Sequence, residues 1–230
     1  MTALRVLTDM ANPSGRAPSL LVLLPGALQK PETLLEEGMA TAVRSRGLTA
    51  DIALVDFGLG AIDEATDGSV AARLDAFLAP ARLQYRSLWL VGVSLGGFMA
   101  LAHAARHPGR VDGLFLLAPY PGNRLLGNAI AAAGGPVVWA AAHAAGAADT
   151  ADDEENVWRW LARHGPAGAP EIHFAHAGAD RFAGGQRMMA QLLPPQRVEL
   201  IAGGHDWPSW RTMWNNFLDR HGARIDGHER

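Results

Sequence analysis

A serine between two glycines is the first feature of this sequence that could do chemistry. Residues 92–96 read G-V-S-L-G; they follow an apolar run and precede a stretch with helical periodicity. A strand that turns sharply into a helix in this way forms a nucleophile elbow, in which the serine hydroxyl stands clear of the sheet. Glycine allows close backbone approach at such a turn, and the helix N-terminus favours negative charge. The pattern predicts that Ser94 is the nucleophile of a hydrolase or an acyl transferase.

A dinucleotide-binding loop is the main alternative for a glycine-rich strand–turn–helix. The fingerprint G-x-G-x-x-G would require glycine at position 94, where this chain has serine. The sequence also contains no cysteine, which excludes disulfides, thiolate metal sites and cysteine nucleophiles. We therefore expect chemistry at Ser94 that needs neither a cofactor nor a metal.

A serine hydroxyl needs a base to take its proton, and a third group to orient that base. His205 comes directly after the last predicted strand, and Asp180 directly after the strand before it. We predict His205 as the base and Asp180 as the orienting acid. Asp206 is the alternative acid, but neighbouring side chains in a loop seldom reach the required geometry.

The negative charge of a tetrahedral intermediate needs hydrogen-bond donors. The backbone N–H of Leu95, next to the nucleophile, is one expected donor of this oxyanion hole. The second should come from the loop after the first predicted parallel strand, where we choose Ala27 and keep Leu28 as the alternative.

Strand-like and helix-like segments alternate along most of the chain. Strands are predicted at residues 19–24, 49–57, 88–93, 112–120, 171–177 and 197–201, and helices at 31–46, 69–83, 97–106, 185–193 and 208–221. This alternation predicts an α/β fold with a mostly parallel twisted sheet and helices on both faces. We expect one domain over residues 1–230, with a small helical cap-like insertion at about 121–169 and a frayed polar tail from residue 222.

The sequence resembles the α/β-hydrolase superfamily, especially its serine esterases, over about residues 19–221. The matching positions are Pro-Gly-Ala at 25–27, the elbow at 92–97, His-Pro at 107–108, Leu-Leu-Ala-Pro at 116–119, Gly-Ala-Asp at 178–180 and Gly-Gly-His at 203–205. The resemblance implies the α/β-hydrolase fold and a triad of Ser94, Asp180 and His205, in the family's chain order. Many members have His-Gly where this chain has Pro25-Gly26, a departure that bears on the oxyanion hole.

These features together predict a serine hydrolase that cleaves a carboxylic ester or thioester through an acyl-enzyme intermediate. An acyltransferase using the same triad is one alternative. A non-catalytic binding module that keeps the fold is another, since a fold alone does not establish an activity.

The insertion carries tryptophans and acidic residues with two interpretations each. Trp139, Trp158 and Trp160 either line an acyl pocket or pack the cap onto the body; of the later tryptophans, Trp207 is expected nearest the site. The acidic run at 152–155 follows Thr150, so we interpret it as the first turn of a helix with a capping box, not as paired catalytic acids.

Four further histidines could suggest a metal. His173 and His176 lie three apart in a predicted strand, so they should point to opposite faces and cannot share one metal ion. His103 and His107 lie on the helix after Ser94, where we expect solvated side chains.

The composition of the chain limits the classes of partner that we expect. The net charge of −3 gives no reason to expect nucleic acid or an anionic membrane. Residues 129–148 lack formal charge, but they are rich in alanine and interrupted by Gly-Gly-Pro, which favours a helical hairpin over a membrane span. With no signal-peptide pattern at the N-terminus, we expect a cytoplasmic protein whose partner is a small-molecule acyl substrate. The sequence predicts no oligomeric state.

Overall fold

The computed structural model describes residues 4–58, 64–144, 152–165 and 168–225. Its strands form one seven-stranded sheet in the order β1-β3-β2-β4-β5-β6-β7, and every neighbouring pair is parallel except β1 with β3. The strands are β1 (Arg5–Asp9), β2 (Ser19–Leu24), β3 (Asp51–Asp56), β4 (Ser87–Val93), β5 (Gly113–Leu117), β6 (Glu171–Ala177) and β7 (Val198–Ile201). The predicted α/β class with a mostly parallel sheet is confirmed.

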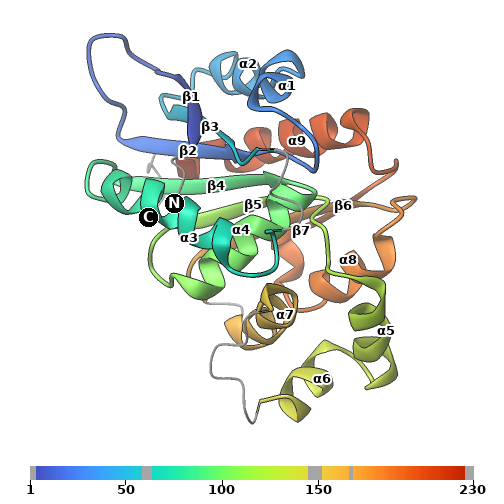
Figure 1. The fold of residues 1–230 in the computed structure, drawn as a ribbon. Helices are drawn as coiled ribbons and strands as arrows, with labels where there is room; N and C mark the ends of the chain where they lie inside the picture. Colours follow the sequence, from blue (N-terminus) through green and yellow to red (C-terminus); the bar gives the residue numbers. More distant parts are fainter. Residues whose placement is uncertain (1–3, 59–63, 145–151, 166–167, 226–230) are drawn as a thin grey trace.

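Helices cover both faces of this sheet (Figure 1). The α-helices are α1 (Pro31–Glu36), α2 (Met39–Arg44), α3 (Ser69–Arg82), α4 (Leu95–Arg106), α5 (Arg124–Ala132), α6 (Pro136–Ala142), α7 (Asp153–His164), α8 (Ala183–Ala190) and α9 (Trp207–Ile225). Helices α1, α2 and α9 pack on one face, while α3, α4, α7 and α8 pack on the other. Each face therefore has its own apolar core, as strands buried on both sides require.

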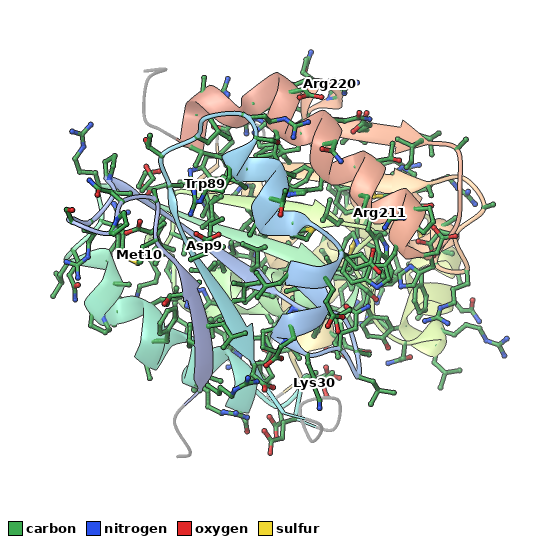
Figure 2. The ribbon with its side chains drawn as sticks, turned by 90° about the horizontal axis from the view of Figure 1, so that it is seen from above. Asp9, Met10, Lys30, Trp89, Arg211 and Arg220 are labelled. Carbon is green, nitrogen blue, oxygen red and sulfur yellow. The ribbon has the colours of Figure 1, made fainter. Side chains whose placement is uncertain are left out.

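The face formed by α1, α2 and α9 is seen from outside in Figure 2. Arg211 and Arg220 project outward from α9. Their side chains are 49% and 59% exposed. The opposite side of α9 buries Trp214 and Phe217 against the sheet. The helix is thus amphipathic, as its position between sheet and solvent demands.

Three elements differ from the sequence-based expectation. The single helix predicted at 31–46 is two helices, because the chain turns at Gly38 with a φ of +79°. Strand β1 was not predicted; it is a five-residue edge strand whose side chains are at most half-buried. The C-terminal helix continues to Ile225 instead of fraying from residue 222, because Gly222 is buried against Leu48.

The insertion at 121–169 contains helices and no strand in its described part. Helix α7 packs along α4 and buries Val157 and Trp158 in the core of that face, while α5 and α6 lie at the lower edge of the molecule (Figure 1). Among the described helices none is by itself long and apolar enough to cross a membrane; α5 and α6 meet that criterion only as a pair, bent by 91°.

The acidic run begins α7 as expected, with one change. Asp152 is the N-cap and accepts a hydrogen bond from the Glu154 N–H, whereas Thr150 lies outside the described residues. Two of the acidic side chains are buried and serve packing: Asp153 pairs with Arg106 of α4, and Glu154 accepts bonds from Tyr120 and Asn123.

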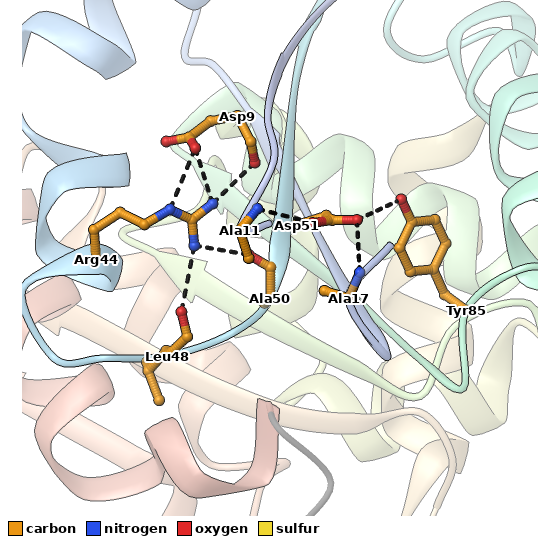
Figure 3. A network of polar contacts seen from close by, with 8 residues as sticks. All are labelled: Asp9, Ala11, Ala17, Arg44, Leu48, Ala50, Asp51 and Tyr85. Atoms are coloured by element: carbon orange, nitrogen blue, oxygen red, sulfur yellow. Dashed lines mark hydrogen bonds and ion pairs between the residues drawn. The ribbon is translucent and has the colours of Figure 1, made fainter. Parts of the chain in front are cut away.

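A buried carboxylate holds the loop between β1 and β2 at the far end of the sheet (Figure 3). Asp51 is fully buried; its oxygens accept the N–H groups of Ala11 and Ala17 and the hydroxyl of Tyr85, at 3.0–3.1 Å. Close by, Arg44 of α2 bonds Asp9. A buried charge needs such partners, and here they fasten a loop that has little apolar contact of its own.

Candidate active site

Ser94 occupies the tight turn between β4 and α4. Its φ of +51° is rare outside glycine and marks a strained position. Its N–H donates to the carbonyl of Leu117 at 3.0 Å, and its carbonyl accepts the N–H of Tyr120 at 2.9 Å. Both partners lie at the carboxyl end of β5, so the neighbouring strand holds the serine in its strained conformation.

Glycines make this turn possible. A Cβ on Gly92 would lie 2.4 Å from the carbonyl oxygen of Gly96, and a Cβ on Gly96 would lie 2.3 Å from that of Leu24. Real Cβ atoms essentially never approach backbone below 3.0 Å, so only glycine fits at either position. Close backbone approach, expected for one of the two glycines, is present at both of them.

The three side chains predicted to act together form one hydrogen-bonded chain. Ser94 Oγ lies 2.8 Å from His205 Nε2, and His205 Nδ1 lies 2.7 Å from Asp180 Oδ2. The Asp180 side chain is fully buried and that of His205 is only 7% exposed. The predicted base and acid therefore reach Ser94 from the loops after β7 and β6.

Asp180 is held in its ionised form. Burial alone would raise its pKa, but hydrogen bonds from His205, from the N–H of Phe182 and from Gln186 together lower the pKa below its ordinary value. An ionised carboxylate can only accept, so the proton between it and His205 belongs to Nδ1. In the neutral imidazole this leaves Nε2 free to accept the hydroxyl proton of Ser94.

The imidazole of His205 lies between two aromatic rings. Phe182 and Trp210 each meet it edge-on, with ring centroids 5.0 and 5.1 Å away. Trp207, expected nearest the site, instead packs against Trp210 at 5.1 Å. Among the described ring contacts, Trp210 is therefore the tryptophan next to the base, because it lies one helical turn into α9 and faces the sheet.

Gln186 is a site residue that the sequence analysis missed. Its side chain is fully buried in α8, and its amide nitrogen donates to Asp180 Oδ2 at 3.1 Å and to the carbonyl of Pro119 at 3.2 Å. It thus joins the loop of the acid to the loop beside the nucleophile. The sequence offers one signal for it: the glutamine comes six residues after the acid and lies on the face of the helix that packs on the sheet.

The loop after β2 lies beside the elbow. Its residues 26–29 form a turn in which the Gln29 N–H donates to the Gly26 carbonyl at 3.2 Å and Leu28 has a φ of +60°. Ala27 and Leu95 line the same small hollow of about 20 Å³. As the first residue of α4, Leu95 has an N–H without an intrahelical acceptor. The two predicted oxyanion donors are neighbours across this hollow.

A larger cleft lies between α5 and α8. It has a volume of about 670 Å³ and is bounded by Tyr120, Trp158, Phe182 and Met188. Tyr120 is the residue whose N–H bonds Ser94, and Phe182 is the ring against His205. Trp158 lines this cleft and also packs the insertion onto the body, as one of its two interpretations predicted. Trp139 is buried in the core of the same face.

Among the residues that the structure describes, one group of side chains could hold a metal ion. The ligand atoms of Asp75, His103 and His107 lie within 4.8 Å of one another. Arg110, however, already occupies both oxygens of Asp75, at 2.7 and 3.3 Å. A metal ion would have to compete with that guanidinium, and the group lies on α3 and α4 away from Ser94.

The expectation that His103 is solvated was wrong. It is fully buried, because α3 and α7 cover the face of α4 that carries it. Burial, together with the nearby His107, lowers the pKa of His103 to about 4. His173 and His176 are also buried within β6, where His173 bonds Glu171 at 2.6 Å.

Comparison with known proteins supports the same architecture. A family model described as the alpha/beta hydrolase fold matches residues 44–133. No curated protein matches the sequence. Among solved structures, a monoacylglycerol lipase from Paleococcus ferrophilus is similar with a TM-score of 0.60 at 13% identity, over 99% of this chain and 100% of that one.

Two esterases are similar at the same level. A ferulic acid esterase has a TM-score of 0.57 at 15% identity, over 94% of this chain and 96% of that chain. Brefeldin A esterase, described as a bacterial homologue of human hormone-sensitive lipase, has a TM-score of 0.57 at 13% identity, over 97% of this chain and 72% of that one. The chain has the α/β-hydrolase fold, and the predicted resemblance is confirmed at that level.

Proposed function

We propose that this protein is a serine hydrolase that cleaves a carboxylic ester or thioester at Ser94. The observation that carries the proposal is the unbroken chain from Ser94 Oγ through His205 to Asp180, with links of 2.8 and 2.7 Å. A serine hydroxyl is activated when a base lies within hydrogen-bond reach of it and a third group orients that base.

The chemistry follows from the protonation states of these groups. As Ser94 Oγ attacks the acyl carbon, His205 Nε2 takes the hydroxyl proton and later returns it to the leaving oxygen or sulfur. Asp180 accepts from Nδ1 throughout and stabilises the imidazolium that forms. Water, deprotonated by the same Nε2, then attacks the acyl-enzyme, which releases the acid and restores Ser94.

The oxyanion would be held by backbone groups. We assign this role to the N–H groups of Leu95 and Ala27, which line one hollow beside the elbow. The N-terminus of α4, which begins at Leu95, adds its partial positive charge. Donors fixed in the fold need no reorganisation as the charge develops.

The fold neighbours fit an ester as substrate. A monoacylglycerol lipase and two esterases share this architecture. The 670 Å³ cleft whose lining includes Tyr120 and Phe182 is within the size range of small-molecule sites. Both points favour a small or medium acyl compound.

Labelling with a fluorophosphonate, followed by mass spectrometry of the modified peptide, tests the proposal without knowledge of the substrate. We expect one modified serine, Ser94, and turnover of 4-nitrophenyl esters. Ser94→Ala should lose both the label and turnover. Ser45→Ala, which changes an exposed serine at the end of α2, is the matched control and should keep both. Substantial turnover by Ser94→Ala, or a label elsewhere, would contradict the mechanism.

A further inference from the structure

We infer that the cleft between α5 and α8 binds a carboxylate carried by the ester substrate, through Arg124 and Arg181. This inference rests on the proposed function and names a substrate class for it: an ester with a free carboxylate on the portion that lies in this cleft. Both arginines line the cleft, one from each wall.

Two residues of the cleft lining contact the catalytic residues directly. Tyr120 lines the cleft and is bonded through its N–H to the carbonyl of Ser94. Phe182, on the same wall, contacts the imidazole of His205 edge-on. We therefore take the cleft as the subsite for one end of a substrate whose acyl carbon is at Ser94.

The charge of the cleft is positive and has no counter-ion in its lining. No aspartate or glutamate is among the described residues that line it. Within the described part of the chain, neither Arg124 nor Arg181 has a carboxylate partner; Arg181 only lies over the ring of Phe182, at 4.8 Å. Most other arginines described here pair with acids, as Arg106 and Arg110 do.

Three carboxylates lie near the cleft, and each has a partner of its own. Asp152, which helps to raise the pKa of Tyr120, caps the start of α7. Glu154 lies beneath the floor, where its oxygens accept from the hydroxyl of Tyr120 and from both nitrogens of Asn123. Asp180 Oδ2 already accepts hydrogen bonds from His205 and Gln186. The two guanidinium groups therefore remain available to an anion, and guanidinium binds carboxylate with paired hydrogen bonds.

The apolar part of the cleft lining favours an apolar group as the rest of the bound portion of the substrate. Phe182, Met188 and the nearly buried Trp158 form the apolar part of the lining. A short acyl or aryl group that ends in a carboxylate meets both features, since its body contacts the apolar surface and its charge reaches the rim.

Two matched pairs of esters test the inference, because the carboxylate could lie on either side of the scissile bond. The first pair is 4-nitrophenyl hydrogen adipate and 4-nitrophenyl methyl adipate, with the charge on the acyl side. The second is 4-acetoxybenzoate and its methyl ester, with the charge on the alcohol side. Each kcat/KM is divided by the rate constant for hydroxide-catalysed hydrolysis, which removes intrinsic reactivity.

We expect the anionic member to be preferred about tenfold in at least one pair, mainly through KM. Arg124→Gln and Arg181→Gln should each lower that preference about three- to fivefold, as expected for a partly exposed ion pair worth up to about 1 kcal/mol, and the double variant should abolish it. Added salt should lower the preference in the wild type. Arg86→Gln is the matched control, since Arg86 is exposed and lies at the opposite end of β4 from Ser94.

Fluorophosphonate labelling of every variant separates the two proposals. This inference is overturned, and the proposed function left intact, if Ser94 is labelled but neither pair shows a preference for the anionic ester. The same holds if Ser94 is labelled and the preference survives in the double variant. Ser94 unlabelled in the wild type, with no ester turned over, overturns both.

Discussion

Asp180 and His205 are positioned by loops that are hydrogen-bonded to each other. The Gly178 N–H donates to the carbonyl of Ile201 at 3.0 Å, and the Ala179 N–H donates to that of Gly203 at 2.9 Å. These bonds continue the pairing of β6 with β7 beyond the ends of the strands. The 2.7 Å contact between Asp180 Oδ2 and His205 Nδ1 is therefore set by backbone geometry.

Replacement of the acid tests its orienting role. In Asp180→Asn the amide can donate to Nδ1 of His205, which would move the imidazole proton to Nε2 and leave nothing to accept the Ser94 proton. If the site behaves like other Ser-His-Asp triads, kcat should fall on the order of 10⁴-fold. Steady-state kinetics with a 4-nitrophenyl ester measures this, with circular dichroism to verify the fold.

Asp206→Asn is the matched comparison for that variant. Asp206 adjoins the base, but its oxygen accepts the N–H of Ser209 and so caps the start of α9. We expect kcat to change much less than in Asp180→Asn. A loss below about tenfold in Asp180→Asn combined with a large loss in Asp206→Asn would assign the orienting role to Asp206.

The sequence predicted the parts of the site that follow from strand order. Ser94, Asp180 and His205 each follow a strand, and parallel strands bring their carboxyl ends to one edge of the sheet. The side chains around them were not predictable in this way. Whether Gln186, Phe182 or Trp210 reaches the triad depends on how α8 and α9 are rotated, which loop conformation decides and periodicity does not.

The elements that the sequence missed lack a strong periodic signal. Strand β1 is short, lies at the edge and buries no side chain fully, so neither alternation nor an apolar run marks it. The break between α1 and α2 depends on one left-handed residue, Gly38, within an otherwise helical pattern. The burial of His103 depends on tertiary packing by α3 and α7, which a single helix does not reveal.

A glycine of the elbow should tolerate no side chain. In Gly96→Ala the new Cβ would meet the carbonyl oxygens of Leu24 and Pro25 at 2.3 and 2.6 Å, which forces the elbow away from the loop after β2. We expect a loss of at least about 100-fold in kcat, because small displacements of a nucleophile are costly. Gly15→Ala, with no neighbour closer than 4.0 Å, is the control. Wild-type kinetics in Gly96→Ala would refute the role given to this glycine.

Removal of the buried carboxylate should destabilise the protein without altering its chemistry. Asp51→Ala leaves two N–H groups and the Tyr85 hydroxyl without their acceptor, at about 1–3 kcal/mol for each group that stays buried. We expect the free energy of unfolding in urea to fall by about 3 kcal/mol. The folded fraction should keep its kcat, because Asp51 begins β3 at the end of the sheet remote from Ser94. Asp219→Ala, at an exposed surface ion pair, should change stability little.

Metal removal should leave ester hydrolysis unchanged. The proposed mechanism uses side chains and backbone groups alone, so incubation with EDTA or 1,10-phenanthroline followed by dialysis should not alter kcat/KM. A loss that added Zn²⁺ or Mn²⁺ restores would contradict this. His107→Gln would then show whether the group of Asp75, His103 and His107 is responsible.

Buried histidines should make the fold sensitive to mild acid. The pKa of His103 is lowered from 6.5 to about 4, chiefly by burial and also by His107, while Asp75 opposes the shift. As pH falls below about 6.5 the unfolded chain takes up a proton at this residue, and the folded protein does not until about pH 4. The free energy of unfolding should therefore decrease across this window, by at most about 1.4 kcal/mol per pH unit for one histidine, and level off below it.

His173 has its pKa lowered to about 4 as well and should add to the same slope. Urea unfolding at several pH values between 7 and 4 measures the effect. His103→Gln should flatten the dependence in this window whatever its effect on absolute stability, whereas His143→Gln, at an exposed position in the insertion, should leave the slope as in the wild type. An unchanged slope in His103→Gln would mean that this histidine is not held neutral by the fold.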